Sequence, residues 1–520
     1  MLLCFTLIYS QLVFSEDITG SIDNGRINWH WYASDSSLVI TGTGELFDTP
    51  VPDGEKMFVD GDSIRLGYLL CFRDIASKIK KVNVGEGINY IGRSAFRYCG
   101  NLKEVEFPTT LKMLDGYVFY DASYHLKKLR IPKNVKNFHS TLGVDYIAAH
   151  MQIDTLYWDV IDHESVGSFK YDSVWNVVFG DEVVRIPESF CSFNPCITEV
   201  NIPGNIKDIG DMCFVHCNNL SKLTLNEGVE RFGYISFNDC PLLTEIKLPK
   251  SLKILDNEFE NVPITEIDIP ENVETIYHFK CSTLRRIRYN ARNAKTDGII
   301  RLLEDSVELY LGDSVQAIND YCFNHGKVKN VIDIPKSVRY IGESAFNSLK
   351  IGAMPPMLDY VGRYAFHAAD FGDSLNLPCL GIIEQGAFSN CPSLKKLVIN
   401  EVDSIKDGVF VSCPLLEYLE VTTTIPSYLG YLPFYNTPIS EIIVPNCECI
   451  DAYEEKWASA KDTYLNPVSF VSKTPCDQEG VYDVETEQNG NKARKEIRDG
   501  SIVISMPDGR EYGIYGNQIR

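Results

Sequence analysis

Large apolar residues recur along the chain in units of 20 to 24 residues wherever no insertion intervenes. Each unit carries a phenylalanine, found at these positions: Phe96, Phe119, Phe193, Phe214, Phe237, Phe259, Phe279, Phe323, Phe346, Phe366, Phe388, Phe410 and Phe434. Five residues before most of them stands a second apolar residue: Ile91, Leu114, Ile209, Phe232, Ile254, Ile318, Ile341, Val361, Ile383, Ile405 and Leu429. A pattern that returns at this period is typical of a solenoid, in which each unit forms one coil.

Each unit closes with a short phrase in which apolar and polar residues alternate, as in Val105, Glu106 and Phe107. A period of two predicts a β-strand with one face buried. The related phrases are LKKLRIP, ITEVNIP, LTEIKLP, ITEIDIP, LKKLVIN, LEYLEVT and ISEIIVP. Many are followed by proline, which ends the strand because it cannot donate a ladder hydrogen bond. One coil is therefore a short strand, a bend, the Ile-to-Phe segment and a return.

A single unit cannot bury its apolar face, but stacked units share a continuous core. Each interior Leu, Ile or Phe then contributes about 1.5 to 3 kcal/mol relative to an exposed position. We therefore predict an elongated, mainly-β repeat solenoid with short irregular or helical turns. Two stretches break the period, at about residues 140–185 and 288–315. The repeat resumes after both stretches with similar sequences, VVFGDEVVRIP and LYLGDSVQAI, so we interpret the stretches as lengthened coils rather than inserted domains.

The cysteines follow the same register. Several stand three residues after a repeat phenylalanine: Cys99, Cys196, Cys217, Cys240, Cys391 and Cys413. A small apolar side chain that recurs at one register position fills the core, so we predict reduced, buried thiols there. Only Cys447, Cys449 and Cys476, at the end of the array, are placed where they are free to pair, and the sequence does not determine whether any disulfide forms.

The consensus Ile-Pro-x-x-Val-x-x-Ile-Gly-x-x-Ala-Phe-x-x-Cys-x-x-Leu, written here as IPKSVRYIGESAF and INYIGRSAFRYCGNL, closely resembles the BspA-like leucine-rich repeats of exported bacterial surface proteins of the Bacteroidetes type. The resemblance covers about residues 79–465. It implies a leucine-rich-repeat, right-handed β-α superhelix. The asparagine ladder of typical leucine-rich repeats is replaced by proline and other residues, so a regular horseshoe with outer helices does not follow.

The flanks of the array have patterns of their own. An apolar run at the start has the length of a signal peptide. Tyr453 and Trp457, four residues apart, predict a helix that caps the open end of the array. Two strand runs around Pro507, Asp508 and Gly509 predict a hairpin. The expected organisation is a signal peptide at 1–15, a β-rich N-terminal cap at 16–75, the repeat array at 76–465 with a capping helix near 450–460, a linker at 466–492, and a C-terminal β-hairpin tail at 493–520.

The charge balance narrows the class of partner. The 520-residue chain has a formal net charge of -22. A site for nucleic acid or an anionic membrane needs clustered Lys and Arg, so these partners are not expected. After the first residues, no stretch approaches the ~20 uninterrupted apolar residues of a transmembrane span. We expect an exported protein, secreted or at the cell surface.

The sequence lacks the motifs that carry enzyme chemistry. It contains no HExxH, GxxxxGK[ST] or GxSxG. The nearest approach to a metal cluster is Cys213, His216 and Cys217, but zinc needs about four converging ligands, and the two cysteines fit the core register. The carboxylate pairs Glu104/Glu106 and Glu266/Asp268 occupy outward strand positions, where solvated surface is the simpler interpretation. We therefore expect no catalysis, no metal and no cofactor.

The outward strand positions are where a ligand would bind. Between the last two core positions of successive phrases stand Glu106, Arg130, Asn201, Thr224, Lys247, Asp268, Arg288, Asp333, Val398, Glu420 and Ile443. This mixture has no repeating contact for a uniform polymer, which favours a protein ligand. The more apolar group of Val398, Tyr418 and Ile443 is a candidate contact patch, although these side chains could equally pack under neighbouring loops.

The sequence leads to two hypotheses of function. The first is a non-enzymatic binding protein, since extended repeat surfaces serve recognition. The family resemblance implies an adhesin that recognises host extracellular-matrix or plasma glycoproteins, or other microbes. The second is a glycan-binding protein for nutrient capture. The ligand itself and the oligomeric state are not determined by the sequence.

Overall fold

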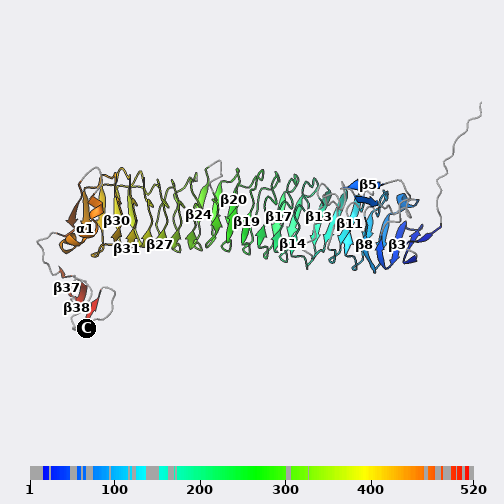
Figure 1. Cartoon of the computed structure of the whole chain (residues 1–520), viewed down its shortest axis with the longest axis horizontal. Helices are drawn as coiled ribbons and strands as arrows, with labels where there is room; N and C mark the ends of the chain where they lie inside the picture. The colour runs from blue at the N-terminus through cyan, green and yellow to red at the C-terminus, as the bar shows by residue number, and fades with distance from the viewer. Residues whose placement is uncertain are drawn as a thin grey trace, which may run out of the picture.

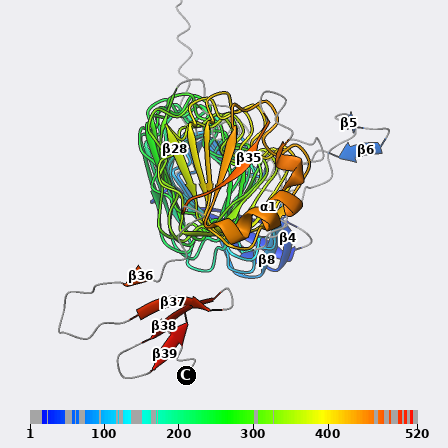
Figure 2. The same cartoon turned by 90° about the vertical axis from the view of Figure 1, so that its left-hand side faces the viewer.

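The coils stack into one long rod, shown in Figure 1 as a computed structural model. The structure describes residues 16–22, 25–46, 56–59, 62–65, 74–92, 95–114, 118–119, 125–135, 151–161, 169, 172–299, 306–325, 327–461, 467–474, 482–483, 494–498, 501–505 and 510–513. The predicted repeat solenoid is confirmed, and its described coils are almost free of helix. The expected signal peptide lies outside the described residues. Seen along the rod in Figure 2, successive coils follow one common outline.

One side of the rod is built from the closing phrases, and we call it the long-strand face. Its strands, in order along the rod, are β1 (Ile18–Ile22), β2 (Ile27–Tyr32), β3 (Ser37–Gly42), β7 (Lys81–Val84), β9 (Glu104–Glu106), β11 (His125–Ile131), β12 (Gln152–Trp158), β13 (Ser173–Phe179), β15 (Glu199–Ile202), β17 (Lys222–Leu225), β20 (Glu266–Ile269), β22 (Arg286–Tyr289), β24 (Glu308–Leu311), β28 (Ser374–Leu377), β30 (Lys396–Ile399), β32 (Tyr418–Val421), β34 (Glu441–Val444) and β35 (Ser469–Ser472). The first three pair antiparallel, and every later pair is parallel. Parallel pairing of β11, β12 and β13, and of β22 with β24, confirms that the two irregular stretches are lengthened coils.

A second side carries strands of two to five residues, and we call it the short-strand face. Its strands are β4 (Gly44–Leu46), β8 (Ile88–Ile91), β10 (Met113–Leu114), β14 (Arg185–Ile186), β16 (Asp208–Ile209), β18 (Arg231–Phe232), β19 (Ile254–Asp256), β21 (Thr275–Tyr277), β23 (Lys295–Thr296), β25 (Ala317–Ile318), β26 (Tyr340–Ile341), β27 (Met357–Val361), β29 (Cys379–Ile383), β31 (Val402–Ile405) and β33 (Tyr428–Leu429). We call β14 to β23 the central coils and β25 to β33 the C-terminal coils.

Glycine follows many short strands because the preceding coil passes too close for a side chain. A Cβ on Gly362 would lie 2.6 Å from the backbone of Gly342, and one on Gly210 would lie 2.5 Å from the carbonyl oxygen of Ile186. Real Cβ atoms do not approach backbone atoms this closely, so the Ile-Gly step of the repeat is a packing requirement rather than a turn requirement.

The Ala-Phe segment forms an arc in which hydrogen bonds run between coils, and this replaces the helical turn that the resemblance implied. Ser344 and Ser348 have left-handed φ values of 50° and 63°. The amide of Phe346, between them, donates to the carbonyl of Ala365 in the next coil at 2.8 Å. The amides of Ser344 and Ser348 donate to the next coil in the same way. The alternate peptide groups of the arc therefore all point along the rod.

The core is a column of stacked side chains. In the C-terminal coils, the rings of Phe346, Phe366, Phe388, Phe410 and Phe434 follow one another at centroid distances of 5.5, 5.1, 5.4 and 5.7 Å. Apart from the half-buried Cys196, the recurring cysteines are buried and free, and most of them do more than fill space. Their thiols donate to a carbonyl of the preceding coil, for example Cys240 to Phe214 and Cys413 to Phe388, both at 3.3 Å.

Two register assignments made from the sequence are wrong. Ile186 pairs with Ile209, which places Cys191 rather than Phe193 at the position of Phe214. The neighbouring Phe190 fills that layer of the core, while Phe193 stacks on the ring of His216 at 4.4 Å. Cys196 is consequently only half-buried. In a later coil Leu255, not Ile254, pairs with Phe232, so Ile254 points outward.

The rod is closed at its C-terminal end by a short helix. After η4 (Cys447–Cys449) comes α1 (Ile450–Lys456), followed by η5 (Ala458–Lys461). Tyr453 and Trp457 are buried with ring centroids 5.1 Å apart, and the indole N–H of Trp457 donates to the carbonyl of Ser427 at 3.0 Å. Their spacing predicted this arrangement. Cys447 is disulfide-bonded and Cys449 is free; Cys476 lies outside the described residues.

Two small elements lie outside the coils. They are the hairpin of β5 (Lys56–Val59) and β6 (Asp62–Arg65), and an antiparallel sheet of β36 (Tyr482–Asp483), β37 (Arg494–Arg498), β38 (Ser501–Ser505) and β39 (Glu511–Gly513). The short η3 (Ala76–Lys78) precedes β7, and its Ala76 is buried in the core. β38 and β39 pair across the Pro-Asp-Gly sequence, where the hairpin was expected.

Candidate binding surfaces

The three residues of the sequence-derived patch lie on adjacent strands of the long-strand face. Val398 on β30 and Ile443 on β34 stand in one row, with Glu420 of β32 between them. Tyr418 lies one row away, opposite Lys396. The structure thus brings Val398 and Ile443 to either side of a carboxylate, and it separates them from the tyrosine.

That carboxylate is the centre of an internal network. The hydroxyl of Tyr418 donates to Glu420 Oε2 at 2.7 Å, and Lys473 Nζ, just beyond β35, lies 2.5 Å from Glu420 Oε1. The side chain of Glu420 is 9% exposed. Its bond to Lys473 lowers the pKa of Glu420 below the ordinary value, and the hydrogen bond that Tyr418 donates to Glu420 raises the pKa of Tyr418. Lys396 lies over the Tyr418 ring, 4.4 Å from its centroid. Tyr418 is therefore already engaged within the protein.

The short-strand face of the C-terminal coils carries a different surface, which we call the aromatic row. It consists of the outward residues Tyr340, Tyr360, Ile382, Ser404 and Tyr428, each in register with the next. The rings of Tyr340 and Tyr360 are stacked, with centroids 5.0 Å apart and planes 8° apart. In-register parallel pairing repeats every ~4.8 Å, which is the distance at which equivalent rings stack.

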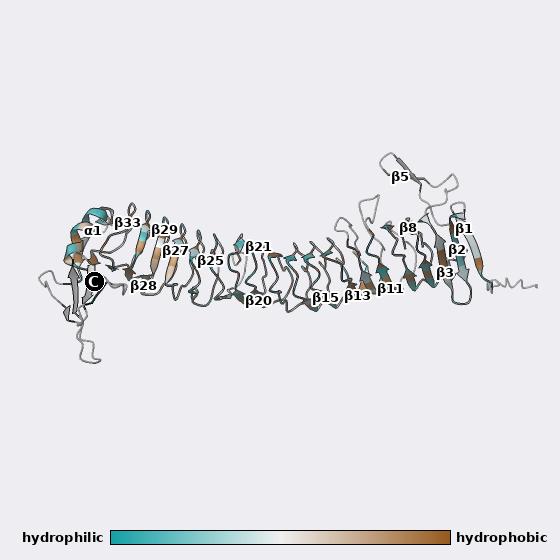
Figure 3. Cartoon of the chain, turned by 90° about the horizontal axis from the view of Figure 1, so that it is seen from below, coloured by the Kyte–Doolittle hydropathy of each residue, from teal (hydrophilic) through white to brown (hydrophobic). Residues whose placement is uncertain are grey.

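The aromatic row ends at a groove between β33 and α1. Ile425, Pro426 and Tyr428 line one side, and Ala452 and Lys456 of the helix line the other. Ile425 is 80% exposed and Tyr428 is 53% exposed. The aliphatic and aromatic surface therefore extends from β26 to the capping helix. In Figure 3, brown apolar segments mark β27 and β29 within this stretch.

The equivalent row of the central coils begins with charged residues that pair with one another and continues with Ile254, Thr275 and Lys295. Arg185, Asp208 and Arg231 follow one another in register. Asp208 lies 3.3 Å from Arg185 and 2.9 Å from Arg231, whose other nitrogen lies 2.6 Å from Asp211. In the adjacent row, Lys253 lies 2.7 Å from Glu230. The charged groups of this surface satisfy one another.

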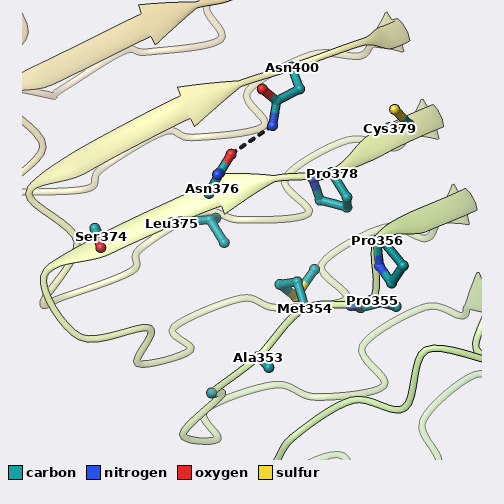
Figure 4. A pocket seen from close by; sticks show the side chains of 11 residues that line it. Ala353, Met354, Pro355, Pro356, Ser374, Leu375, Asn376, Pro378, Cys379 and Asn400 are labelled. Carbon is teal, nitrogen blue, oxygen red and sulfur yellow. Dashed lines mark hydrogen bonds between the residues drawn. The ribbon is translucent and has the colours of Figure 1, made fainter. Parts of the chain in front are cut away.

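A shallow groove on the long-strand face of the C-terminal coils is shown in Figure 4. Met354, Pro355 and Pro356 form one wall, opposite β28. Asn400 donates to the side-chain oxygen of Asn376 at 2.7 Å and spans the neighbouring strands. The exposed thiol of Cys379 lies at its rim. Asn400 also donates to the carbonyl of Leu377 and accepts from the hydroxyl of Thr422, so its own side chain is engaged within the protein.

The residues considered for chemistry are all engaged elsewhere. Cys213 and Cys217 are buried and donate to carbonyl oxygens, and His216 lies 3.5 Å from Asp239. Burial raises the pKa of both thiols. Over the part of the chain that the structure describes, no three His, Cys, Asp or Glu side chains converge as metal ligands.

The outward carboxylate pairs take part in ion pairs between coils. Lys81 lies 3.0 Å from Glu106 and 3.9 Å from Glu104. Arg288 lies 2.9 Å from Asp268. Carboxylates held in this way support the ladder between coils. Separately, none of the described helices is long and apolar enough to cross a membrane.

The sequence prediction of a binding surface used only the outward positions of the closing phrases. The aromatic row lies on the short strands instead, so the prediction missed it. The signal was nevertheless present: the residue directly before the core aliphatic of the Ile-Gly step is tyrosine at Tyr340, Tyr360 and Tyr428. At this position the central coils carry arginine, aspartate, isoleucine, threonine or lysine, and no tyrosine.

Known proteins share the repeat. A family model described as "BspA type Leucine rich repeat region" matches the chain in six copies, over residues 68–142, 165–287, 305–378 and 348–454. No curated protein matches the sequence.

Several solved bacterial structures match the chain. One is a leucine-rich repeat protein from Bacteroides ovatus, with 16% identity and a TM-score of 0.33, covering 86% of this chain and 98% of that one. Another is a leucine rich cell surface protein from Faecalibacterium prausnitzii, with 18% identity and a TM-score of 0.22, covering 89% and 99%. A third is the pneumococcal vaccine antigen PcpA, with 14% identity and a TM-score of 0.25, covering 61% and 92%. At these scores we draw no conclusion about function from them.

Proposed function

Because the chain belongs to the family of BspA-type leucine-rich repeat proteins, we propose that it is a non-enzymatic, surface-displayed or secreted binding protein. Its partner is another protein, a host extracellular-matrix or plasma glycoprotein or a surface protein of another microbe. It binds as an adhesin, through the outer faces of the C-terminal coils.

The observation that carries this proposal is the contrast between the two short-strand surfaces. The central rows pair their own charges, whereas the aromatic row exposes tyrosine and aliphatic side chains. Tyrosine, methionine and arginine are enriched in protein interfaces, and a contiguous exposed apolar patch marks a contact site. Met357 and Arg339 stand beside the row and belong to the same group of residue types.

The patch of Val398, Tyr418 and Ile443 is a secondary contact in this proposal. Val398 and Ile443 are half-buried, and the Glu420 network lies between them. A partner that binds over this face therefore meets two aliphatic side chains flanking a neutralised carboxylate.

The experiment uses the full chain, immobilised and exposed to a panel of purified matrix and plasma glycoproteins. We expect saturable binding of at least one of them, reduced by Tyr360→Ala and unchanged by Ile254→Ala in the central coils. Absence of binding to every protein in the panel and to whole cells of co-resident bacteria would contradict the proposal.

Glycan capture is the second candidate, favoured by the exposure of Tyr428 and of Tyr431 beside it. A sugar stacks on the free face of an aromatic ring. Tyr340 and Tyr360 cover each other's faces, and Lys406 lies 5.1 Å from the centroid of the Tyr428 ring. A glycan array with Tyr418→Ala, Tyr428→Ala and Tyr431→Ala variants separates the two functions, since only sugar binding would depend on free ring faces.

A further inference from the structure

Two carboxylates stand beside the aromatic row. Asp359 and Asp403 directly precede Tyr360 and Ser404 in the chain, and both are exposed. Gly381 occupies the equivalent position between them, so no side chain fills the space. Within the described residues, neither aspartate forms an ion pair, in contrast to Asp208, Asp211 and Glu230 of the central coils.

The nearby cations are held at the two ends of the row. The guanidinium of Arg339 donates to the carbonyl of Met357 at 2.9 Å, and Lys406 lies over the ring of Tyr428. The middle of the surface, around Tyr360 and Ile382, therefore combines apolar side chains with unneutralised negative charge. The net charge of -22 on the whole chain has the same sign.

We propose that the short-strand face of the C-terminal coils binds a cationic, partly apolar polypeptide segment laid along the rod axis. The inference rests on the proposed function and names the chemistry of the partner segment. Lysine or arginine side chains of the segment meet Asp359 and Asp403, and its aromatic or aliphatic side chains cover Tyr340, Tyr360 and Ile382. Charge complementarity of this kind gives specificity and speeds association.

The dimensions of the face fit an extended segment. Parallel coils repeat every ~4.8 Å, so Asp359 and Asp403, two coils apart, are separated by about 10 Å along the rod. An extended chain of the polyproline-II type advances about 3.1 Å per residue with three residues per turn, so side chains three positions apart lie on the same side of it, about 9 Å apart. Basic residues three positions apart therefore match the two aspartates. The row from Tyr340 to Tyr428 spans four coil steps, about 19 Å, or about six residues of the partner.

The groove at α1 gives the segment an end point. Ile425 and Tyr428 on the coil side and Ala452 on the helix side accept an apolar side chain at the end of the segment. Lys456 and Glu455 stand at the rim, where the chain leaves the surface. At the other end of the row, next to Tyr340 of β26, the in-register residue is Ala317 of β25. Its small side chain does not block the segment, which can continue in that direction.

The experiment selects random 12-residue peptides displayed on phage against the immobilised full chain. We expect the selected peptides to be enriched in Lys or Arg spaced three residues apart, with aromatic or aliphatic residues between them. Synthetic copies of these peptides are then measured by fluorescence anisotropy. Tyr340→Ser with Tyr360→Ser should weaken binding at least tenfold, since interface tyrosines are frequent hot spots.

Asp359→Asn with Asp403→Asn should weaken binding three- to tenfold at low salt, with the difference vanishing at about 1 M salt because screening removes it. The matched control is Ile254→Ser with Lys295→Ala, at equivalent positions of the central coils, which should leave binding unchanged. Thermal unfolding of each variant excludes loss of the fold as the cause.

Several outcomes overturn the inference. Selected peptides without basic residues, or binding that both double variants leave intact, contradict it. So does a concentration-dependent dimer that Tyr340→Ser with Tyr360→Ser dissociates, because the face would then bind a second copy of the chain. If a glycoprotein of the panel binds but the face variants do not affect it, the proposed function stands and this surface assignment fails.

Discussion

The central coils and the C-terminal coils share one backbone plan and differ in what their outward rows carry. In both, the short strands pair in parallel. In both, a glycine follows the core apolar residue of some short strands, where the neighbouring coil packs closely against the backbone. In the central coils the outward row begins with Arg185, Asp208 and Arg231, and in the C-terminal coils it includes Tyr340 and Tyr360.

The difference shows that the buried core residues are sufficient to define the rod. The outward residues of the short strands can therefore differ between regions and serve either stability or binding. Charged residues at this position stabilise the stack by pairing between coils, at the modest strength typical of partly exposed ion pairs. Aromatic residues at the same position present an apolar surface to solvent. A surface that carries exposed aromatic rings in place of ion pairs is suited to binding another protein.

The largest expected effect lies in the shared core. Phe388→Ala removes a ring stacked between Phe366 and Phe410, and Phe214→Ala removes its counterpart beside Phe237. Each should lower the free energy of unfolding by about 3 to 5 kcal/mol, from lost burial and the cavity left behind. Urea unfolding, with hydrogen exchange to locate the loss, measures both. A loss in one region without a comparable loss in the other would break the idea of a common core.

A smaller effect should separate the two outward rows. Arg231 is 28% exposed and forms hydrogen bonds with Asp208 and Asp211. Arg231→Met should cost about 1 kcal/mol at low salt and less at high salt. The matched change Tyr360→Met should shift stability by less than about 0.5 kcal/mol. Equal losses measured by thermal unfolding would mean that the aromatic row is structural, like the charged one.

The smallest effect concerns the ion pair of the C-terminal coils on the long-strand face. The folded state lowers the pKa of Glu420, chiefly through Lys473. The pair therefore stabilises the fold fully above the unfolded pKa, near 4.5, and this contribution is lost as pH falls through the lower folded pKa. Glu420→Gln should destabilise the protein by about 1 kcal/mol or less at neutral pH. The gap in melting temperature between this variant and the native protein should close at about pH 3; a gap that persists there would show that packing, not charge, is what the variant loses.

Much of the fold could be predicted because the repeat encodes it locally. Each closing phrase alternates apolar and polar residues, and each phenylalanine recurs near one period, so strands, core and rod follow from nearest-neighbour stacking. The capping helix followed from Tyr453 and Trp457. The arc formed by the Ala-Phe segment could not be predicted, because its left-handed residues, such as Ser344 and Tyr364, are of types with no strong preference for that conformation.

The coil register and the binding surface were decided by tertiary structure. Coils differ in length, so equivalent residues are not a constant distance apart in sequence, and only strand pairing shows that Cys191 rather than Phe193 lies over Phe214. For the same reason, Tyr340, Tyr360 and Tyr428 become one row only when the coils are stacked. The sequence by itself determined that the chain is a solenoid, because apolar residues that recur at one period are all buried when successive units stack on one another. Which outward side chains meet, and which charges stay unpaired, depended on the alignment of each coil with its neighbours.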